Sequence, residues 1–245
     1  MARQQGLYAY DDRYRRVFDA GAIHWNDPEP NSSLARVLDQ LPRRSRCVEF
    51  GCGEGYQARF IASRGHSVTA IDLSPTVIAK AIRETPPGLR VRFIVGDVTD
   101  PVSLDLPPSC FQLAVNIGCL HMMANDEDRA AHLGLIHRAL VSGGKLFLQN
   151  GLDPDDVTPA SAEERHELAE IREHKALAPG HPVQNTIVTA EGPRTLMLPL
   201  CPACRMLSLD GYVRELADHG FRILSAERRG SANCSFEAVI LAERP

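Results

Sequence analysis

The residues best suited to chemistry lie in one glycine-rich cluster, where positions 49–55 read Glu-Phe-Gly-Cys-Gly-Glu-Gly. Gly51, Gly53 and Gly55 carry no side chain, so the backbone at these positions can approach a bound ligand closely. The helical pattern that starts at residue 56 offers unpaired N–H groups and the positive end of a helix dipole, which attract a carboxylate or a phosphate. Glycine turns also occur for steric reasons, so the cluster alone leaves a structural role open.

Acidic residues follow the next two apolar runs, at Asp72 and Asp97. Since the carboxyl ends of neighbouring parallel strands share one edge of a sheet, we expect both residues to lie beside the glycine cluster. Asp72 can accept both hydroxyl protons of a ribose there, and Asp97 with Val98 can bind an adenine edge. Either aspartate alone could instead cap a helix or form a turn. With Glu49, they place three acids at three adjacent strand ends, which favours a nucleoside site.

Two nucleotide cofactors are candidates for this site. A nicotinamide dinucleotide prefers Gly-x-Gly-x-x-Gly and avoids negative charge near its pyrophosphate. This chain has Gly-x-Gly-x-Gly instead, with Glu49 at its entrance. S-adenosylmethionine carries an ammonium, a carboxylate, a ribose and an adenine, so every element of the cluster has a partner in it. The pattern favours this cofactor and keeps a nicotinamide-dependent oxidoreductase as the alternative.

The elements that must position these residues follow from the hydrophobic patterning. Short apolar runs alternate with helical patterns between residues 46 and 149, which predicts crossover connections and a parallel sheet covered on both faces. We predict strands at 47–50, 67–71, 91–95, 112–117 and 145–149, and helices at 56–63, from Ser74-Pro75 onward, and at 126–140, the last closed by Gly143-Gly144. A helix at 209–219 that ends at Gly220 and two strands at 221–226 and 236–241 complete the chain.

The predicted fold is therefore α/β: a doubly wound, Rossmann-like, seven-stranded and mostly parallel sheet with an antiparallel last strand. The chain is predicted to be a single domain over residues 1–245. Its expected parts are an N-terminal helical cap at 1–45, a cofactor-binding half at 46–149, a lid or substrate insertion at 150–204, and a C-terminal helix and hairpin at 205–245.

These motifs resemble those of class I S-adenosylmethionine-dependent methyltransferases over residues 46–150, and more loosely over 205–245. In the resemblance, residues 49–55 match the first motif, 96–98 the adenine-binding segment, 115–121 the motif beneath the methyl donor and 140–147 the fifth-strand motif. The resemblance implies methyl transfer from S-adenosylmethionine to a small-molecule acceptor with a thiol, hydroxyl or amine. The implied donor-binding residues are Glu49, Gly51, Cys52, Gly53, Asp72, Leu73, Asp97, Val98, Asn116 and Ile117.

The first 45 residues are loosely similar to small-molecule methyltransferases of the thiopurine and tellurite-resistance type. The similarity rests on Tyr14, Gly21, Trp25 and the segment 30–34, and it implies that this region closes over the donor. Asn116 stands where thiopurine methyltransferases usually have an acid, so the chain departs from that subfamily here.

The acceptor is expected beyond the ends of the fourth and fifth strands. His121 is our candidate for the catalytic base or an acceptor-orienting group, because imidazole titrates near neutrality. It could instead cap the strand or pack on the adenosine. Trp25, Met122 and Arg205 are the other candidate acceptor contacts, with core packing as the alternative for the methionine and plain surface exposure for the arginine.

The long connection 150–204 is expected to carry its own elements. We predict a helix at 161–177 that acts as a lid or is a solvated surface helix, and strands at 186–189 and 194–198. Cys201 and Cys204 have a spacing that suits zinc or a redox pair, but Cys234 and His181 are the only further ligands in reach, so we predict no metal site. A non-catalytic regulator that uses this cysteine pair, and thiols that meet a thiophilic substrate, stay open.

Charge and composition narrow the function classes. The chain has 27 basic and 31 acidic residues, a net charge of −4, so we expect no nucleic-acid partner. The chain has no apolar run long enough to predict a membrane span, and the first residues do not have the pattern of a secretory signal. The seven cysteines are expected to be reduced thiols in the cytoplasm. We expect a monomer or a homodimer.

Overall fold

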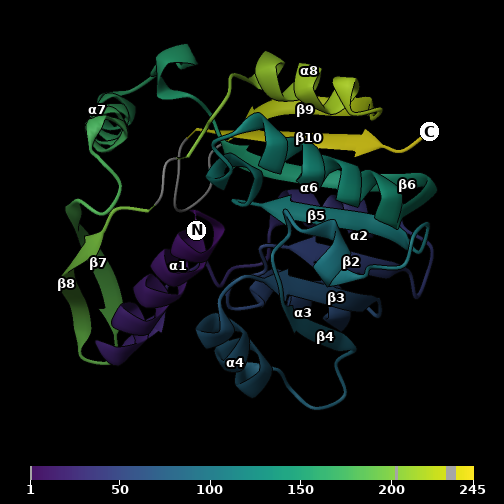
Figure 1. Ribbon diagram of the computed structural model, residues 1–245, viewed down its shortest axis with the longest axis horizontal. Helices are drawn as coiled ribbons and strands as arrows, with labels where there is room; N and C mark the ends of the chain where they lie inside the picture. The colour runs from purple at the N-terminus through teal and green to yellow at the C-terminus, as the bar shows by residue number, and fades with distance from the viewer. Residues whose placement is uncertain (1, 202–203, 230–235) are drawn as a thin grey trace.

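The computed structural model describes residues 2–201, 204–229 and 236–245. Its main sheet has seven strands in the order β4-β3-β2-β5-β6-β10-β9 (Figure 1). β2 to β6 run parallel, and β10 is antiparallel to both of its neighbours. The strands are β2 Arg46–Phe50, β3 Ser67–Asp72, β4 Val91–Val95, β5 Phe111–Ile117, β6 Leu140–Gly151, β9 Arg222–Arg229 and β10 Glu237–Glu243. The predicted doubly wound, mostly parallel sheet is confirmed.

Helices cover both faces of this sheet. The helices of the described chain are α1 Ala2–Asp19, α2 Ser32–Leu38, α3 Tyr56–Ser63, α4 Pro75–Glu84, α5 Pro101–Leu104, α6 Asp126–Ala139, α7 Ala162–Ala176 and α8 Leu209–Asp218, with single turns η1 Leu120–Met122 and η2 Pro154–Asp156. α2, α3 and α4 pack on one face, and α6 and α8 pack on the other. The start of α4 is as predicted, because the Ser74 hydroxyl accepts a hydrogen bond from the Val77 N–H and Pro75 takes the first helical position.

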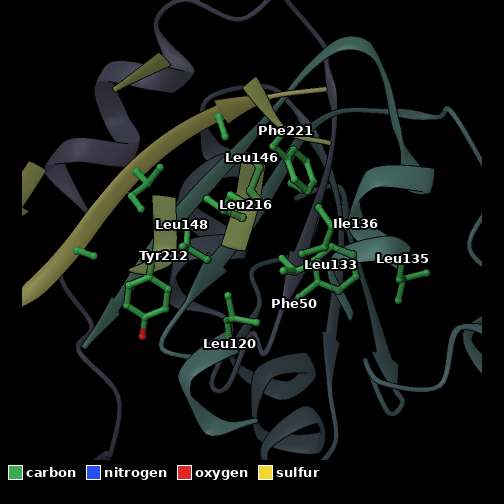
Figure 2. Close-up of a cluster of buried hydrophobic side chains, with 14 of the residues drawn as sticks. Phe50, Leu120, Leu133, Leu135, Ile136, Leu146, Leu148, Tyr212, Leu216 and Phe221 are labelled. Carbon is green, nitrogen blue, oxygen red and sulfur yellow. The ribbon is translucent and has the colours of Figure 1, made fainter. Parts of the chain in front are cut away.

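The core on the α6–α8 face is shown in Figure 2. Phe50 and Leu146 from the sheet meet Leu133 and Ile136 of α6 and Leu216 of α8, and all five side chains are fully buried. Each contributes about 1.5–3 kcal/mol by leaving water. This packing holds the strand ends that form the site in a fixed geometry.

One predicted boundary is wrong. The glycine pair at 143 and 144 does not close the helix before it, because α6 already ends at Ala139 and Leu140 is extended, with ψ 147°. The chain continues through Gly143, at φ 75°, within β6. The Gly143 N–H donates to the Arg244 carbonyl, 2.8 Å away, so the glycine lets the amino end of β6 meet the last residues of the chain.

A second, three-stranded antiparallel sheet joins the insertion to the N-terminal cap. It contains β1 Ala22–His24, β7 Pro182–Thr189 and β8 Gly192–Pro199 in the order β1-β7-β8. The two strands predicted in the insertion are present, but the pairing of β7 with β1 was not predicted. Val17, Ile187 and Leu198 form a small buried cluster where α1 packs on this sheet. Figure 1 shows α1 beside β7 and β8, at one side of the main sheet.

Candidate functional site

A cavity of about 1120 Å³ lies where the carboxyl ends of the central strands meet the N-terminal cap. Its size exceeds that of a typical single-ligand pocket, roughly 300–1,000 Å³, so a nucleoside-sized ligand and a second small molecule fit together. Nine residues predicted for the donor line it: Glu49, Gly51, Cys52, Gly53, Asp72, Leu73, Asp97, Val98 and Ile117. The parallel sheet brings these residues together from four strand ends.

The glycine cluster forms a tight turn between β2 and α3. Gly51 and Gly53 have φ values of 72° and 51°, which only glycine adopts without strain. A methyl group at Gly53 would lie 2.4 Å from the Asn26 Oδ1, so the turn also has no room for a side chain. The Gly53 N–H donates to the Asp72 Oδ2 at 2.8 Å, and the Ser74 N–H donates to the other carboxylate oxygen at 3.0 Å. Asp72 thereby joins the turn to the start of α4.

Glu49 is the most unusual acid in the cavity wall. Its side chain is 3% exposed, and within the described chain its Oε2 has no hydrogen-bond partner. Burial, and then the charge of Asp72, raise the pKa of this carboxyl to about 8. A buried oxygen without a partner destabilises a fold by about 1–3 kcal/mol. A ligand cation at Glu49 would satisfy that oxygen and restore the ionised form.

Asp97 and Val98 form the wall after β4. The Asp97 Oδ1 accepts hydrogen bonds from the Thr99 N–H at 2.8 Å and the Thr99 hydroxyl at 2.7 Å, so one oxygen has the turn-forming role that the sequence left open. The Val98 carbonyl lies 3.2 Å from the His132 Nδ1. Because that ring nitrogen can only donate to a carbonyl, a neutral His132 has its acceptor at Nε2.

Asn116 does not line the cavity, and its predicted contact with the donor is not supported. Its side chain is fully buried on the opposite face of β5 from Ile117, since successive side chains of a strand alternate. The Asn116 Nδ2 lies 2.7 Å from the His132 Nε2, and its Oδ1 accepts from the Leu120 N–H and from the Asn150 amide, both at 3.0 Å. Asn116 therefore ties β5 to η1, β6 and α6.

His121 also lies outside the cavity lining, which argues against our prediction of a catalytic base. The Gly151 N–H donates to the His121 Nδ1 at 3.1 Å, so that lone pair is occupied and the neutral ring carries its proton on Nε2. Burial, and then the charge of Arg129, lower the pKa of His121 to about 4. The turn η1 directs this ring toward β6, whereas Cys119 and Met122 face the cavity.

Of the other predicted acceptor contacts, Trp25 and Met122 line the cavity and Arg205 does not. The Arg205 Nη1 lies 2.6 Å from an Asp126 carboxylate oxygen, and its Nη2 lies 3.7 Å from Glu215. These two acids neutralise the guanidinium, so the prediction that Arg205 holds an acidic acceptor is not supported.

The predicted helix of the insertion is present as α7. All of its residues are described, and none of them lines the cavity. Most of α7 is exposed, and Leu168 alone is buried, against the core of the main sheet. The surface-helix alternative therefore describes α7 better than the lid. The insertion reaches the cavity through Cys201.

Sequence reasoning missed the residues that hold the N-terminal cap on the site. Glu54 is fully buried, and its Oε2 accepts from the Trp25 N–H at 2.8 Å and the Asn26 N–H at 2.6 Å. Its Oε1 lies 3.1 Å from the Lys80 Nζ, which also donates to the Ile23 carbonyl at 3.0 Å. The position of Glu54 between two glycines was visible in the sequence, but nothing in the sequence identified its partners.

Two further wall features were not predicted. Tyr10 of α1 lines the cavity, and within the described chain its hydroxyl is buried without a hydrogen-bond partner. On another wall, Asn31 donates to the Gln149 Oε1 at 2.7 Å, and the Gln149 Nε2 donates to Glu237 at 2.8 Å. Asn31 belongs to the 30–34 segment noted in the sequence, but Gln149 is 118 residues away, so only the fold could bring these groups together.

The predicted cysteine pair is only partly in the site, since Cys201 lines the cavity and Cys204 is exposed. Each of the six described cysteines is a free thiol, and Cys234 lies outside the described residues. Within residues 2–201, 204–229 and 236–245, no group of three or more His, Cys, Asp or Glu side chains is placed to hold a metal ion. In the same residues, no helix is both long and apolar enough to cross a bilayer.

Comparison with known sequences identifies relatives of the central half. Residues 47–144 match a family model described as a methyltransferase domain. The ubiquinone biosynthesis O-methyltransferase of Xylella fastidiosa (strain 9a5c) is 30% identical over 142 residues, which cover 54% of this chain and 56% of that protein. The magnesium-protoporphyrin O-methyltransferase of Rhodobacter capsulatus is 43% identical over 70 residues, or 28% of this chain and 31% of that protein. The chain thus spans about half or less of these curated relatives.

Solved structures share the fold over nearly the whole chain. The 1,6-didemethyltoxoflavin-N1-methyltransferase of Burkholderia thailandensis, solved with its substrate and S-adenosylhomocysteine, has a TM-score of 0.62 at 19% identity, covering 99% of this chain and 89% of that one. A TehB-like SAM-dependent methyltransferase from Corynebacterium glutamicum has a TM-score of 0.56 at 21% identity and covers 98% of both chains. At these identities the similarity shows the fold.

Proposed function

We propose that this chain, which carries a class I S-adenosylmethionine-dependent methyltransferase domain, transfers the methyl group of that donor to a small-molecule acceptor. The observation that carries the proposal is the Glu49 Oε2, a buried oxygen without a partner in the wall of a cavity that glycine backbone and Asp72 also line. A buried anionic oxygen is stable only when a cation or a proton satisfies it. The ammonium group of the donor is such a cation.

The remaining donor contacts follow from the same wall. Asp72, at the end of β3, would accept from the ribose hydroxyls, and Asp97 with Val98 would bind the adenine. The donor's carboxylate would lie at the start of α3, where no side chain caps the helix and where Tyr56 and Gln57 line the cavity. Each group of the donor thus has a chemically suitable partner in one continuous wall.

The donor, when bound, supplies an electrophilic methyl group on a sulfonium centre. The chain's own contribution is to orient the acceptor and to exclude water, because proximity and alignment can account for about 7–11 kcal/mol of a barrier. Trp25 and Met122 are placed to hold the acceptor against the donor. We assign no catalytic base, since the Nδ1 of His121 is occupied and the ring lies outside the cavity.

For the acceptor, we propose an aromatic small molecule with a hydroxyl group. Tyr10, Trp25 and Tyr56 give the cavity flat apolar surfaces that suit an aromatic ring. Two of the relatives above are named O-methyltransferases, and a third, from Synechocystis, is named for a hydroquinone, at 29% identity over 120 residues, 49% of this chain and 36% of that protein. A thiol or an amine is the alternative acceptor.

Incubation with methyl-labelled donor and panels of phenols, thiols and amines, followed by mass spectrometry, tests this function. We expect the label on the oxygen of one or more phenols. Label on thiols or amines alone would contradict the acceptor class. Donor binding without transfer to any panel member would contradict the enzyme and favour a regulator.

We further propose that residues 1–245 act as one methyltransferase unit in the cytoplasm, as a monomer or homodimer without a nucleic-acid partner. The free state of the six described cysteines supports a reducing compartment. The pairing of β1 with β7 supports one functional unit, because it ties the N-terminal cap to the insertion.

A further inference from the structure

A second hollow, of about 380 Å³, lies at the amino ends of β2, β3 and β4, at the opposite edge of the sheet from the donor cavity. Arg46, Arg90 and Arg92 line it together with the hydroxyl-bearing side chains of Ser67 and Thr69. The proposed methyl transfer uses none of these residues.

The strand register places these side chains on one face of the sheet. Arg46 of β2 is paired with Ser67 of β3, and Thr69 of β3 is paired with Arg92 of β4. Since side chains alternate along a strand, Ser67 and Thr69 point to the same side of the sheet, and Arg92 shares that side through its pairing with Thr69, while Arg90 directly precedes β4. In each of these two pairs, a side chain with a hydroxyl group therefore lies next to an arginine.

The hollow exists because the helix after β4 is very short. α5 has four residues, Pro101–Leu104, and Arg46, Arg90 and Arg92 are left exposed. Its Leu104 packs against Gly96, where a methyl group would lie 2.4 Å from the leucine Cδ2. The amino half of this face has no helix over β3 and β4 in the described chain, and Phe111 forms one wall of the space.

The charge of this hollow is not neutralised by the protein. Within the described chain, no carboxylate oxygen lies within 4.0 Å of a nitrogen of Arg46, Arg90 or Arg92. The Arg46 guanidinium stacks on the Phe111 ring at 5.5 Å, and Arg90 donates to the Gly65 carbonyl. Burial, and then the charges of Arg64 and Arg90, lower the pKa of the neighbouring His66. A positive field therefore persists here in a chain of net charge −4.

We propose that this hollow is a binding site for a phosphate-type oligoanion, such as the phosphate groups of a small metabolite. Guanidinium groups match phosphate oxygens in pairs of hydrogen bonds, and their flat charged forks suit a polyanion better than a single carboxylate. Ser67 and Thr69 add neutral donors between the arginines. The proposal does not depend on the methyl-transfer function, since the two sites lie at opposite edges of the sheet.

Calorimetric titration of the full chain with inorganic pyrophosphate at constant ionic strength tests this site. We expect saturable binding, at least tenfold weaker in Arg92→Gln and intermediate in Arg92→Lys, which keeps the charge but loses the fork. Arg83→Gln is the matched control, because Arg83 is an exposed arginine on α4 that does not line the hollow. The affinity of this control should stay within twofold of the parent chain.

The same titration in the presence of saturating S-adenosylhomocysteine locates the anion. Pyrophosphate binding that persists there supports the hollow, whereas its loss would place the anion in the donor cavity. Absence of saturable binding, or equal weakening in Arg83→Gln and Arg92→Gln, would overturn the proposal, the latter because it indicates diffuse charge attraction only. Failure of methyl transfer would leave these binding results unaffected.

Discussion

The Oε1 of Glu54 lies 3.1 Å from the Nζ of Lys80, and the two side chains are 0% and 7% exposed. The other oxygen of the same carboxylate accepts two N–H groups from the segment that contains Trp25 and Asn26. This buried ion pair therefore fixes the N-terminal cap against the glycine turn, and the shape of the cavity depends on it.

Loss of that pair should destabilise the fold. Glu54→Gln removes the fully buried carboxylate of the pair, while Glu84 stays 2.5 Å from the Lys80 Nζ, so we expect the free energy of unfolding to fall by about 2 kcal/mol. Urea denaturation measures this change. Asp12→Asn removes a surface pair with Arg16 and should change stability by less than about 1 kcal/mol. Equal effects of the two substitutions would show that the buried pair has no special role.

Gly53→Ala should weaken donor binding more than it changes the fold. The added methyl would lie 2.4 Å from the Asn26 Oδ1, so the turn or Asn26 must move within the cavity wall. Gly65→Ala is the matched control, because Gly65 has a positive φ of 92° but no atom within 4 Å of its Cβ position. We expect similar backbone strain in both variants and at least tenfold weaker S-adenosylhomocysteine binding in Gly53→Ala alone. Unchanged affinity in Gly53→Ala would contradict the site.

Much of this fold could be predicted from the sequence, because the signals were local. The limits predicted for the 56–63 helix and the 91–95 strand match α3 and β4, since a glycine turn precedes the helix and a mostly apolar run that ends at Gly96 defines the strand. Asp72 lies beside the glycine turn as expected, because parallel strand ends share an edge.

The sequence did not predict which way individual side chains point or which distant segments contact each other. No pattern reveals that His121 turns toward the Gly151 N–H or that Asn116 faces α6. Glu54 and Lys80 are 26 residues apart in the sequence, so their contact depends on how α4 packs beside the glycine turn. The Trp25 segment is likewise held at the site by long-range contacts, namely its hydrogen bonds to Glu54 and the pairing of β1 with β7.

The buried His132 should make the protein sensitive to acid. Burial lowers its pKa to about 4, below the ordinary value of 6.5, so the unfolded chain binds the proton more readily. The stability from the neutral ring is present above about pH 6.5 and is lost as the pH falls through about 4. The buried His121, with its pKa also near 4, adds a similar loss, so urea denaturation between about pH 7 and about pH 4.5 should show a loss on the order of 2 kcal/mol from each ring, and His132→Gln should remove the His132 share. His166→Gln, at an exposed histidine, is the control and should leave the pH dependence unchanged. An equal loss in the parent chain and in His132→Gln would show that other groups cause it.

Donor binding should release a proton from Glu49. Burial, and then Asp72, hold its pKa near 8, so the carboxyl is mostly protonated at about pH 7 and must ionise to accept an ammonium group. Calorimetry of S-adenosylmethionine binding in buffers of different ionisation enthalpy measures the released protons. We expect release by the parent chain, decreasing above about pH 8, and less release by Glu49→Gln at the same pH. Identical proton release by both would show that Glu49 does not meet the ammonium.

Titration of the purified chain with S-adenosylmethionine, compared with Asp72→Asn, is the most direct test of the account. Asp105→Asn is the control, since Asp105 is an exposed acid that does not line the cavity. We predict one saturable site in the parent chain and in the control, and at least tenfold weaker binding in Asp72→Asn with the fold retained by circular dichroism. Absence of binding by the parent chain, or equal affinity in Asp72→Asn, would contradict the claim that the carboxyl edge of this sheet holds the methyl donor.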